Sequence, residues 1–209
     1  MLKSLAVLAI VTAVPLAAQS AAPQVPGQKD VSRITGGTYR TDPSHSLVEW
    51  EVNHFGFNDY FGLFGEVAGT LTLDPKNPAA AKVDVTIPVS KVVTASAGLT
   101  DHLLRAGKDG GKPDFFGPSP ADARFVSNHI VVNGTEAEIH GSLTLNGVTK
   151  PVTLEAEFVG AGANPMSKKE TVGFHGEATI KRSDFGITTA LPFVADEVSI
   201  DVTVAFEKA

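Results

Sequence analysis

The chain has 209 residues, no cysteine, 12 phenylalanines but only two tyrosines, and a formal net charge of −6 at pH 7. The lack of cysteine excludes disulfides and a lipid-anchored cysteine, so an exported domain of this length must be held together by its apolar core. The acidic balance, with no cluster of basic residues, argues against nucleic acid and anionic lipid headgroups as partners.

The N-terminus has the pattern of an export signal. Lys3 precedes an apolar run over residues 5–16, and the small residues of 18–22 suit cleavage by signal peptidase. The run is shorter than the about 20 apolar residues that a membrane span needs. We therefore expect a signal peptide over residues 1–22, in preference to a retained anchor.

Residues 23–37 are rich in Pro, Gln, Ala and Gly and are expected to form a flexible lead-in. Beyond them, alternating apolar and polar side chains predict strands with one dry and one wet face. Two Asn-Gly dipeptides, Asn133-Gly134 and Asn146-Gly147, predict tight hairpin turns because these residues tolerate positive φ. The predicted strands cover residues 47–52, 69–73, 82–87, 123–132, 135–145, 148–158, 172–180 and 198–206.

Eight two-faced strands joined by turns fit either a closed barrel or a two-sheet sandwich, and alternation alone does not separate the two. One short helix is predicted over residues 101–106, with Thr100 as its N-cap and Gly107 at its end. A helix of this length must lean on the sheet to be stable. No internal repeat or second domain is visible.

The segment 53–65 contains four phenylalanines and a tyrosine separated by glycines, with neither helical nor strand periodicity. A loop this apolar should not lie open to water. It either folds back as a plug over the core or forms part of a ligand pocket. The pattern leaves both alternatives open.

Catalytic and metal-binding patterns are weak. The six histidines lack His-x-His spacing or helical i, i+4 spacing, so we expect neither a metal site nor a cofactor. There is no Gly-x-Ser-x-Gly elbow and no glycine-rich phosphate loop. Most carboxylates fall on the wet faces of strands, which favours a binding protein over an enzyme.

Several short motifs carry a resemblance to a known family. They are the hairpin of residues 143–158, His45-Ser46, Asp101-His102-Leu103, Asp114-Phe115-Phe116 and Arg182-Ser183-Asp184-Phe185-Gly186. Together they resemble the YceI-like family of periplasmic, lipocalin-like barrels that bind polyisoprenoid or related long-chain lipids. The resemblance implies an all-β fold over residues 38–209, an antiparallel eight-stranded lipocalin-like barrel with one short helix, in the periplasm. Two departures stand out: Thr100 replaces a frequent arginine, and the segment between Leu104 and Pro113 is longer than the family spacing.

The resemblance also implies a ligand, an isoprenoid or similar long-chain lipid bound, stored or transported in an apolar cavity. We expect its chain to contact side chains in or beside the matched segments: Trp50, Phe55, Phe57, Phe61, Leu99, Leu103, Phe116 and Phe185. His45 and His102 are expected to hold a polar headgroup. For residues 182–186 a structural turn is favoured over ligand contact, because turn chemistry explains each residue except Phe185.

Two other functions stay open from the sequence. The first is an enzyme acting on an amphiphilic lipid through polar groups at the pocket mouth. The second is a structural stress-response barrel whose core is filled by its own side chains. A homodimer and transient contact with a membrane are compatible with all three functions.

Overall fold

A computed structural model describes residues 24–209, and the predicted signal peptide lies outside the described residues. None of the helices in this part of the chain is long and apolar enough to cross a membrane. The strands are β1 (Gly37–Thr41), β2 (Leu47–His54), β3 (Asn58–Phe64), β4 (Ala68–Leu73), β5 (Lys82–Ile87), β6 (Val92–Val93), β7 (Ala123–Asn133), β8 (Glu136–Leu145), β9 (Val148–Ala163), β10 (Glu170–Lys181) and β11 (Glu197–Lys208). The helical elements are α1 (Ala97–Leu104) and the 3-10 turns η1 (Val31–Arg33), η2 (Pro78–Ala80), η3 (Val89–Lys91), η4 (Lys108–Gly110) and η5 (Arg182–Phe185).

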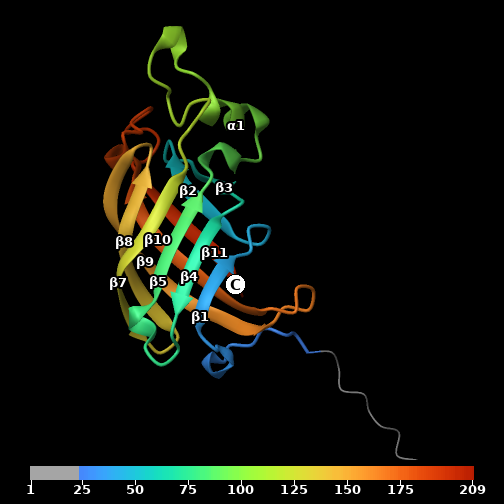
Figure 1. The fold of residues 1–209 in the computed structure, drawn as a ribbon. Coiled ribbons are helices and arrows are strands. Elements are labelled where there is room, and N and C mark those ends of the chain that lie inside the picture. Colours follow the sequence, from blue (N-terminus) through green and yellow to red (C-terminus); the bar gives the residue numbers. More distant parts are fainter. Residues whose placement is uncertain (1–23) are drawn as a thin grey trace, which may run out of the picture.

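Eight antiparallel strands close into a barrel in the order β1-β4-β5-β7-β8-β9-β10-β11, and β11 pairs back onto β1 (Figure 1). Closure places Tyr39 opposite Lys208 and Thr41 opposite Phe206. The first half of β11 pairs instead with β2, from which β3 and β6 extend the sheet. The eight-stranded barrel with one short helix is therefore confirmed, and the sandwich is excluded because the sheet closes on itself.

Both predicted hairpin turns are present, in two forms. Asn146 and Gly147 have φ values of 52° and 77° and connect Leu145 to its partner Val148. At the other turn Asn133 pairs with Glu136, so the two-residue loop is Gly134-Thr135, with φ of 64° at Gly134. Glycine there supplies the positive φ that the first loop position needs, which moves the loop by one residue.

The helix begins earlier than expected, at Ala97 instead of Asp101, and ends at Leu104 with Arg105 as its C-cap, before the expected Gly107. The side chain of Ser96 caps it by accepting a hydrogen bond from the backbone N–H of Leu99. The prediction that Thr100 is the N-cap was wrong because a serine four residues upstream already serves that role. The Thr100 hydroxyl instead accepts a hydrogen bond from the backbone N–H of Thr94, at 3.0 Å.

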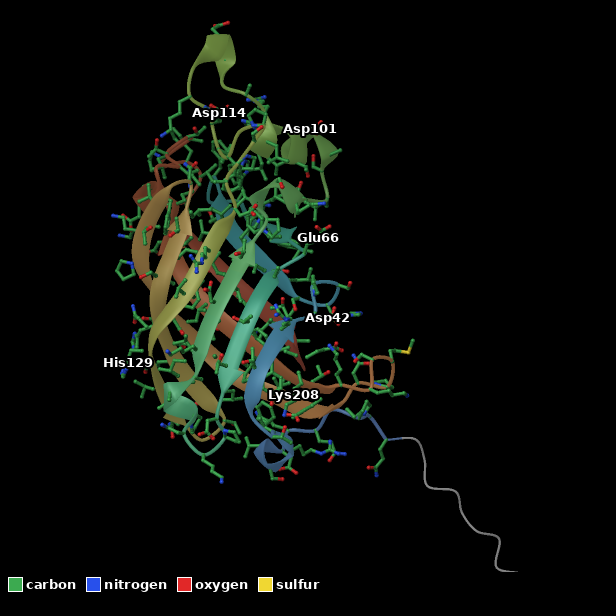
Figure 2. All side chains as sticks on the ribbon, viewed as in Figure 1. Asp42, Glu66, Asp101, Asp114, His129 and Lys208 are labelled. Atoms are coloured by element: carbon green, nitrogen blue, oxygen red, sulfur yellow. The ribbon has the colours of Figure 1, made fainter. Side chains whose placement is uncertain are left out.

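The barrel has two distinct ends (Figure 1). One, here called the α1 end, carries α1, η5 and the β8–β9 turn. The opposite η2 end carries η1, η2 and the β7–β8 turn. Asp101 and Asp114 lie at the α1 end, whereas Lys208 lies toward the η2 end (Figure 2). A core cluster of buried residues joins the strand ends near the η2 end and consists of Tyr39, Leu71, Leu73, Phe158, Ala161, Val172 and Phe206.

Candidate functional site

The barrel encloses an apolar cavity with a volume of about 270 Å³. One bound water needs only about 10–15 Å³ measured in this way, so the space is far larger than a packing defect. The barrel is therefore not filled by its own side chains. Its walls include the inward-facing positions of four consecutive strands: Ile139 and Leu143 of β8, Val152 and Leu154 of β9, Ala178 and Ile180 of β10, and Ile200 and Val202 of β11.

Strict alternation along the strands produces this wall. On β9, Val152 and Leu154 line the cavity, whereas the alternate residues Thr153 and Glu155 are exposed to solvent. The inward side chains are only partly buried because they face open space instead of a packed neighbour. Alternation of side chains thus gives the single sheet of the barrel an apolar inner face and a polar outer face.

The cavity opens at the η2 end. Its exposed lining residues all lie there, namely Val31 in η1, which is 51% exposed, and Gly134, Thr135 and Glu136 at the β7–β8 turn. At the α1 end the lining residues Val89 and Ala123 are buried. We call the opening bounded by η1, η2 and the β7–β8 turn the mouth.

The α1 end is closed by two motifs that the sequence singled out. Nε2 of His102 lies 2.9 Å from Oδ2 of Asp114, and Nη2 of Arg105 donates to the same oxygen at 3.0 Å. The hydrogen bonds from His102 and then from Arg105 lower the pKa of the Asp114 carboxyl. The backbone N–H of Phe116 donates to the Leu103 carbonyl at 3.0 Å. We call α1 with residues 114–117 the cap.

The cap reaches the cavity through aromatic packing. The ring of Phe116 lies edge-on to Phe64, with 5.9 Å between the centroids. Phe64 lines the cavity, so Phe116 supports the wall from behind. The longer segment between Leu104 and Pro113 contains η4. Near the end of this segment, Nζ of Lys112 donates a hydrogen bond to the Gly186 carbonyl. It therefore joins the cap to η5.

The motif at residues 182–186 organises the loop that follows it. Arg182 is only 6% exposed, and its guanidinium donates to the carbonyls of Ala195, Ile187, Thr189 and Val194. Burial lowers the pKa of this guanidinium. Gly186 has a φ of 75° and ends η5. These contacts give the motif a structural role, as the sequence favoured.

None of the ten residues predicted to contact the ligand is in the cavity lining. Leu103 and Phe185 are 5% and 1% exposed and lie in the packing of the α1 end, and Leu99 and His102 belong to α1 itself. The side chain of His45 is 76% exposed in the loop between β1 and β2, where its Nδ1 lies 2.7 Å from the Asp42 carboxylate. The contact of these five residues with a ligand stays a prediction, and the structure places them at the closed end or on the surface.

The aromatic segment divides in the same way. Phe55, Phe57 and Phe61 are 47%, 88% and 57% exposed around the β2–β3 turn. Trp50 lies on the inward face beside the lining residue Ile200. Its Nε1 is the one side-chain nitrogen or oxygen in the described part of the chain that is buried without a hydrogen-bond partner. Residues 58–64 of the segment form β3 and not the expected loop, and Phe64 lines the cavity, so the segment is partly surface and partly pocket wall.

The residues that line the cavity were not predicted as site residues, because most of the predicted ligand contacts lay in segments expected to be loops. The inward positions of β8–β11 were recognised as strand faces, but nothing in a period-two pattern tells a packed core from a hollow one. The small residues Ala156, Gly176 and Ala178 on these faces are a signal that could have been used. Val31 and Ile34 of the lining come from the segment expected to be a flexible lead-in.

The outer face of the barrel carries a row of carboxylates in direct register. Glu49, Asp201, Glu177, Glu155 and Glu138 occupy facing positions on β2, β11, β10, β9 and β8. Like charges directly opposite one another destabilise a sheet. The row gives this face a strongly acidic character, in contrast with the apolar interior.

A histidine lies beside this row. Nε2 of His175 is 2.9 Å from Oδ2 of Asp201, and this hydrogen bond is the main cause of the raised pKa of His175. His175, Glu177 and Asp201 bring three potential ligand atoms within 4.8 Å of one another on the outer face. The sequence did not predict this grouping because its members come from two strands.

Comparison with known proteins places these features in a family. Residues 39–206 match the YceI-like domain. Protein YceI of Escherichia coli O157:H7 is 41% identical over 161 residues, which cover 77% of this chain and 80% of that protein. The structure of BcnA from Burkholderia cenocepacia superposes with a TM-score of 0.65 and 27% identity, covering 79% of this chain and 98% of BcnA.

A more distant likeness concerns the fold alone. A polyisoprenoid binding domain from Saccharophagus degradans, implicated in plant cell wall breakdown, has a TM-score of 0.56 and 13% identity. The match covers 82% of this chain and 98% of that domain. The same barrel is therefore built by sequences that share few residues.

Proposed function

This chain belongs to the YceI-like family, and on that premise we propose that it binds, stores or carries a long-chain isoprenoid or similar lipid inside its barrel. The observation that carries the proposal is the apolar cavity, open at one end and closed at the other. The description of the distant S. degradans domain as polyisoprenoid-binding supports the same ligand class.

The cavity suits a long apolar chain. Its lining on β8 extends from Ala137 to Leu145, a distance of about 26 Å at about 3.3 Å per residue. Each methylene transferred from water into such a site contributes about 0.8 kcal/mol. Affinity can therefore come from burial alone, with little hydrogen bonding.

Binding is favoured over catalysis because the polar groups do not converge on the cavity. Within the lining, ionisable side chains belong only to Glu136 at the mouth and His175, whose ring pairs with Asp201 on the outer face. His102, expected from the sequence to hold a polar headgroup, is engaged by Asp114 in the cap. The site therefore fits a ligand-binding cavity better than an active site.

The test is a titration of isoprenoid alcohols of increasing chain length, at low and at high ionic strength. We expect affinity to rise steeply with chain length and to change little with salt, because area and not charge supplies the free energy. Affinity that is independent of chain length, or that disappears in salt, would refute the proposal. Mass spectrometry of an organic extract of the natively produced protein would identify the ligand.

Location in the periplasm is part of the proposal and rests on the signal pattern of residues 1–22. N-terminal sequencing of protein from the native host is expected to find a chain that starts after cleavage between residues 18 and 22. Recovery of the intact N-terminus from the membrane fraction would indicate an anchor instead.

A further inference from the structure

We propose that residues 26–35, here called the strap, form a movable cover over the mouth and swing about the junction at Gly36 to admit and release the ligand. The inference rests on the proposed function, since a cover matters only if something enters. It adds an entry route and the element that controls it.

The strap is a thin lid over the cavity. Val31 and Ile34 contribute to the lining, yet Val31 is 51% exposed to solvent on its other side. No residue of η1 is buried. A single layer of side chains therefore separates the cavity from water at this point, and lifting it would widen the mouth without disturbing the barrel strands.

Apart from Ile34, which packs against the core cluster, the side chains that attach the strap make polar contacts. Lys29 forms an ion pair with Glu157, and both side chains are 48% exposed. Nη1 of Arg33 donates to the carbonyl of Ala161 at 3.1 Å, and the hydroxyl of Thr35 donates to Glu170 at 2.6 Å. Contacts of this kind exchange readily with water and contribute little net free energy. They hold a closed position and still permit opening.

The closed position has a shaped seat on β9. The backbones of Gln28 and Ala161 exchange two hydrogen bonds, at 3.1 and 2.9 Å. A Cβ atom added at Gly162 would lie 2.1 Å from the carbonyl oxygen of Pro26, and one at Gly160 would lie 3.2 Å from that of Gln28. Because these two residues lack a Cβ atom, the strap backbone can approach β9 closely. The closed strap therefore packs on β9 in one specific position.

Two glycines lie where the strap meets the barrel. Gly36 and Gly37 have φ values of +79° and +110°, in a region that other residues rarely adopt. The backbone N–H of Gly36 donates to the buried phenol of Tyr39 at 3.1 Å, which anchors the barrel side of the junction. Motion is therefore confined to the chain before Gly36, and the freedom of glycine suits a hinge there.

A disulfide lock tests the inference. The natural chain has no cysteine, so Gln28→Cys with Ala161→Cys introduces a single pair. Directly opposed, hydrogen-bonded partners of an antiparallel pair have Cα atoms about 5.5 Å apart, within the range that a disulfide spans. A matched control is Thr144→Cys with Thr149→Cys, which links facing positions of β8 and β9 away from the mouth.

The readout is the rate at which a fluorescently tagged geranylgeraniol enters and leaves, compared between oxidised and reduced protein. We expect oxidation to slow both rates at least tenfold in the locked variant, with recovery on reduction, and to change neither in the control. Equal entry and release rates in the oxidised and reduced forms of the Gln28→Cys, Ala161→Cys variant would refute the proposal that the strap moves. If the unaltered chain fails to bind the probe, the proposed function itself fails and the strap with it.

A second variant keeps the test decisive if the buried position 161 does not tolerate cysteine. Gly162→Ala places a methyl group against the Pro26 carbonyl and should unseat the strap, so that probe release becomes faster by several fold. Gly173→Ala on β10 is its control, because the nearest atom to an added Cβ there is 3.8 Å away. Identical release rates for the two variants would overturn the inference.

Discussion

The phenol of Tyr39 donates a 2.6 Å hydrogen bond to Oε1 of Glu170, which joins β1 to the start of β10 beside the mouth. Tyr39 is fully buried, whereas Glu170 also accepts hydrogen bonds from the backbone and hydroxyl of Thr35. Burial, followed by the contact with Glu170, raises the pKa of Tyr39 to about 12. Burial acts to raise the pKa of Glu170 as well, but the hydrogen bonds from Thr35 and Tyr39 together lower it.

Tyr39→Phe should destabilise the barrel by about 1–3 kcal/mol, because it removes one hydrogen bond to Glu170 and leaves the N–H of Gly36 without its acceptor. Urea unfolding measures the change, with Tyr60→Phe at the other tyrosine as control. An unchanged unfolding midpoint would contradict this role. In the unaltered chain, the contribution of Tyr39 is present below about pH 10 and is lost as the pH rises toward about 12. Absorbance of the phenolate should show one tyrosine ionising near the upper value.

Leu154→Trp should fill the cavity from the β9 wall. We expect the affinity for a long isoprenoid alcohol to fall at least tenfold, which corresponds to about 1.4 kcal/mol. The folded state should tolerate the larger side chain because it faces open space instead of a packed core. Val159→Trp, at a position of β9 that is 57% exposed, is the control and should bind normally. Equal affinities of the two variants would place the ligand elsewhere.

Glu177→Gln should stabilise the protein by about 0.2–1 kcal/mol, because it removes the charge that faces both Asp201 and Glu155. The melting temperature at pH 8, where His175 carries less charge, should rise by roughly one to three degrees. Glu51→Gln is the matched control, since Glu51 faces Ser199 and Phe61 and no carboxylate. A gain as large in the control would show that the row of carboxylates is not the cause.

The pKa of His175 should lie above its ordinary value because its ring is hydrogen-bonded to Asp201, with Glu177 and Glu157 nearby. The folded state therefore gains stability from the protonated ring. That gain is complete below about pH 6.5 and is lost as the pH rises through the folded pKa. Titration of the His175 ring by NMR measures the shift, and Asp201→Asn should reduce it. The remote Asp42→Asn should leave the titration unchanged, and a shift that survives Asp201→Asn would assign it to another group.

Local patterns carried much of the fold. Alternation over residues 148–158 places successive side chains on opposite faces whatever the rest of the chain does, and Asn146-Gly147 supplies the positive φ values of the turn. The hairpin and the strands β2, β4, β5 and β7–β11 were therefore predictable from the sequence, whereas β1, β3 and β6 were not. Together with the matched motifs, the predicted strands indicated the family. The helix start was not, because Ser96 and Thr100 are both acceptable N-caps and only the packing of α1 selects between them.

The sequence by itself determined most of the strands with their dry and wet faces, and the resemblance that implies a lipid-binding barrel, but it did not show β1, β3 or β6. Only the tertiary structure decided closure, since the pairing of Tyr39 with Lys208 joins opposite ends of the domain. It also decided that the interior is hollow, that the motif at 101–103 meets the one at 114–116 in a cap, and that Val31 lies at the mouth. The reason is physical: strand periodicity is a local property of the backbone, whereas a cavity and its opening are the space left between residues distant in sequence.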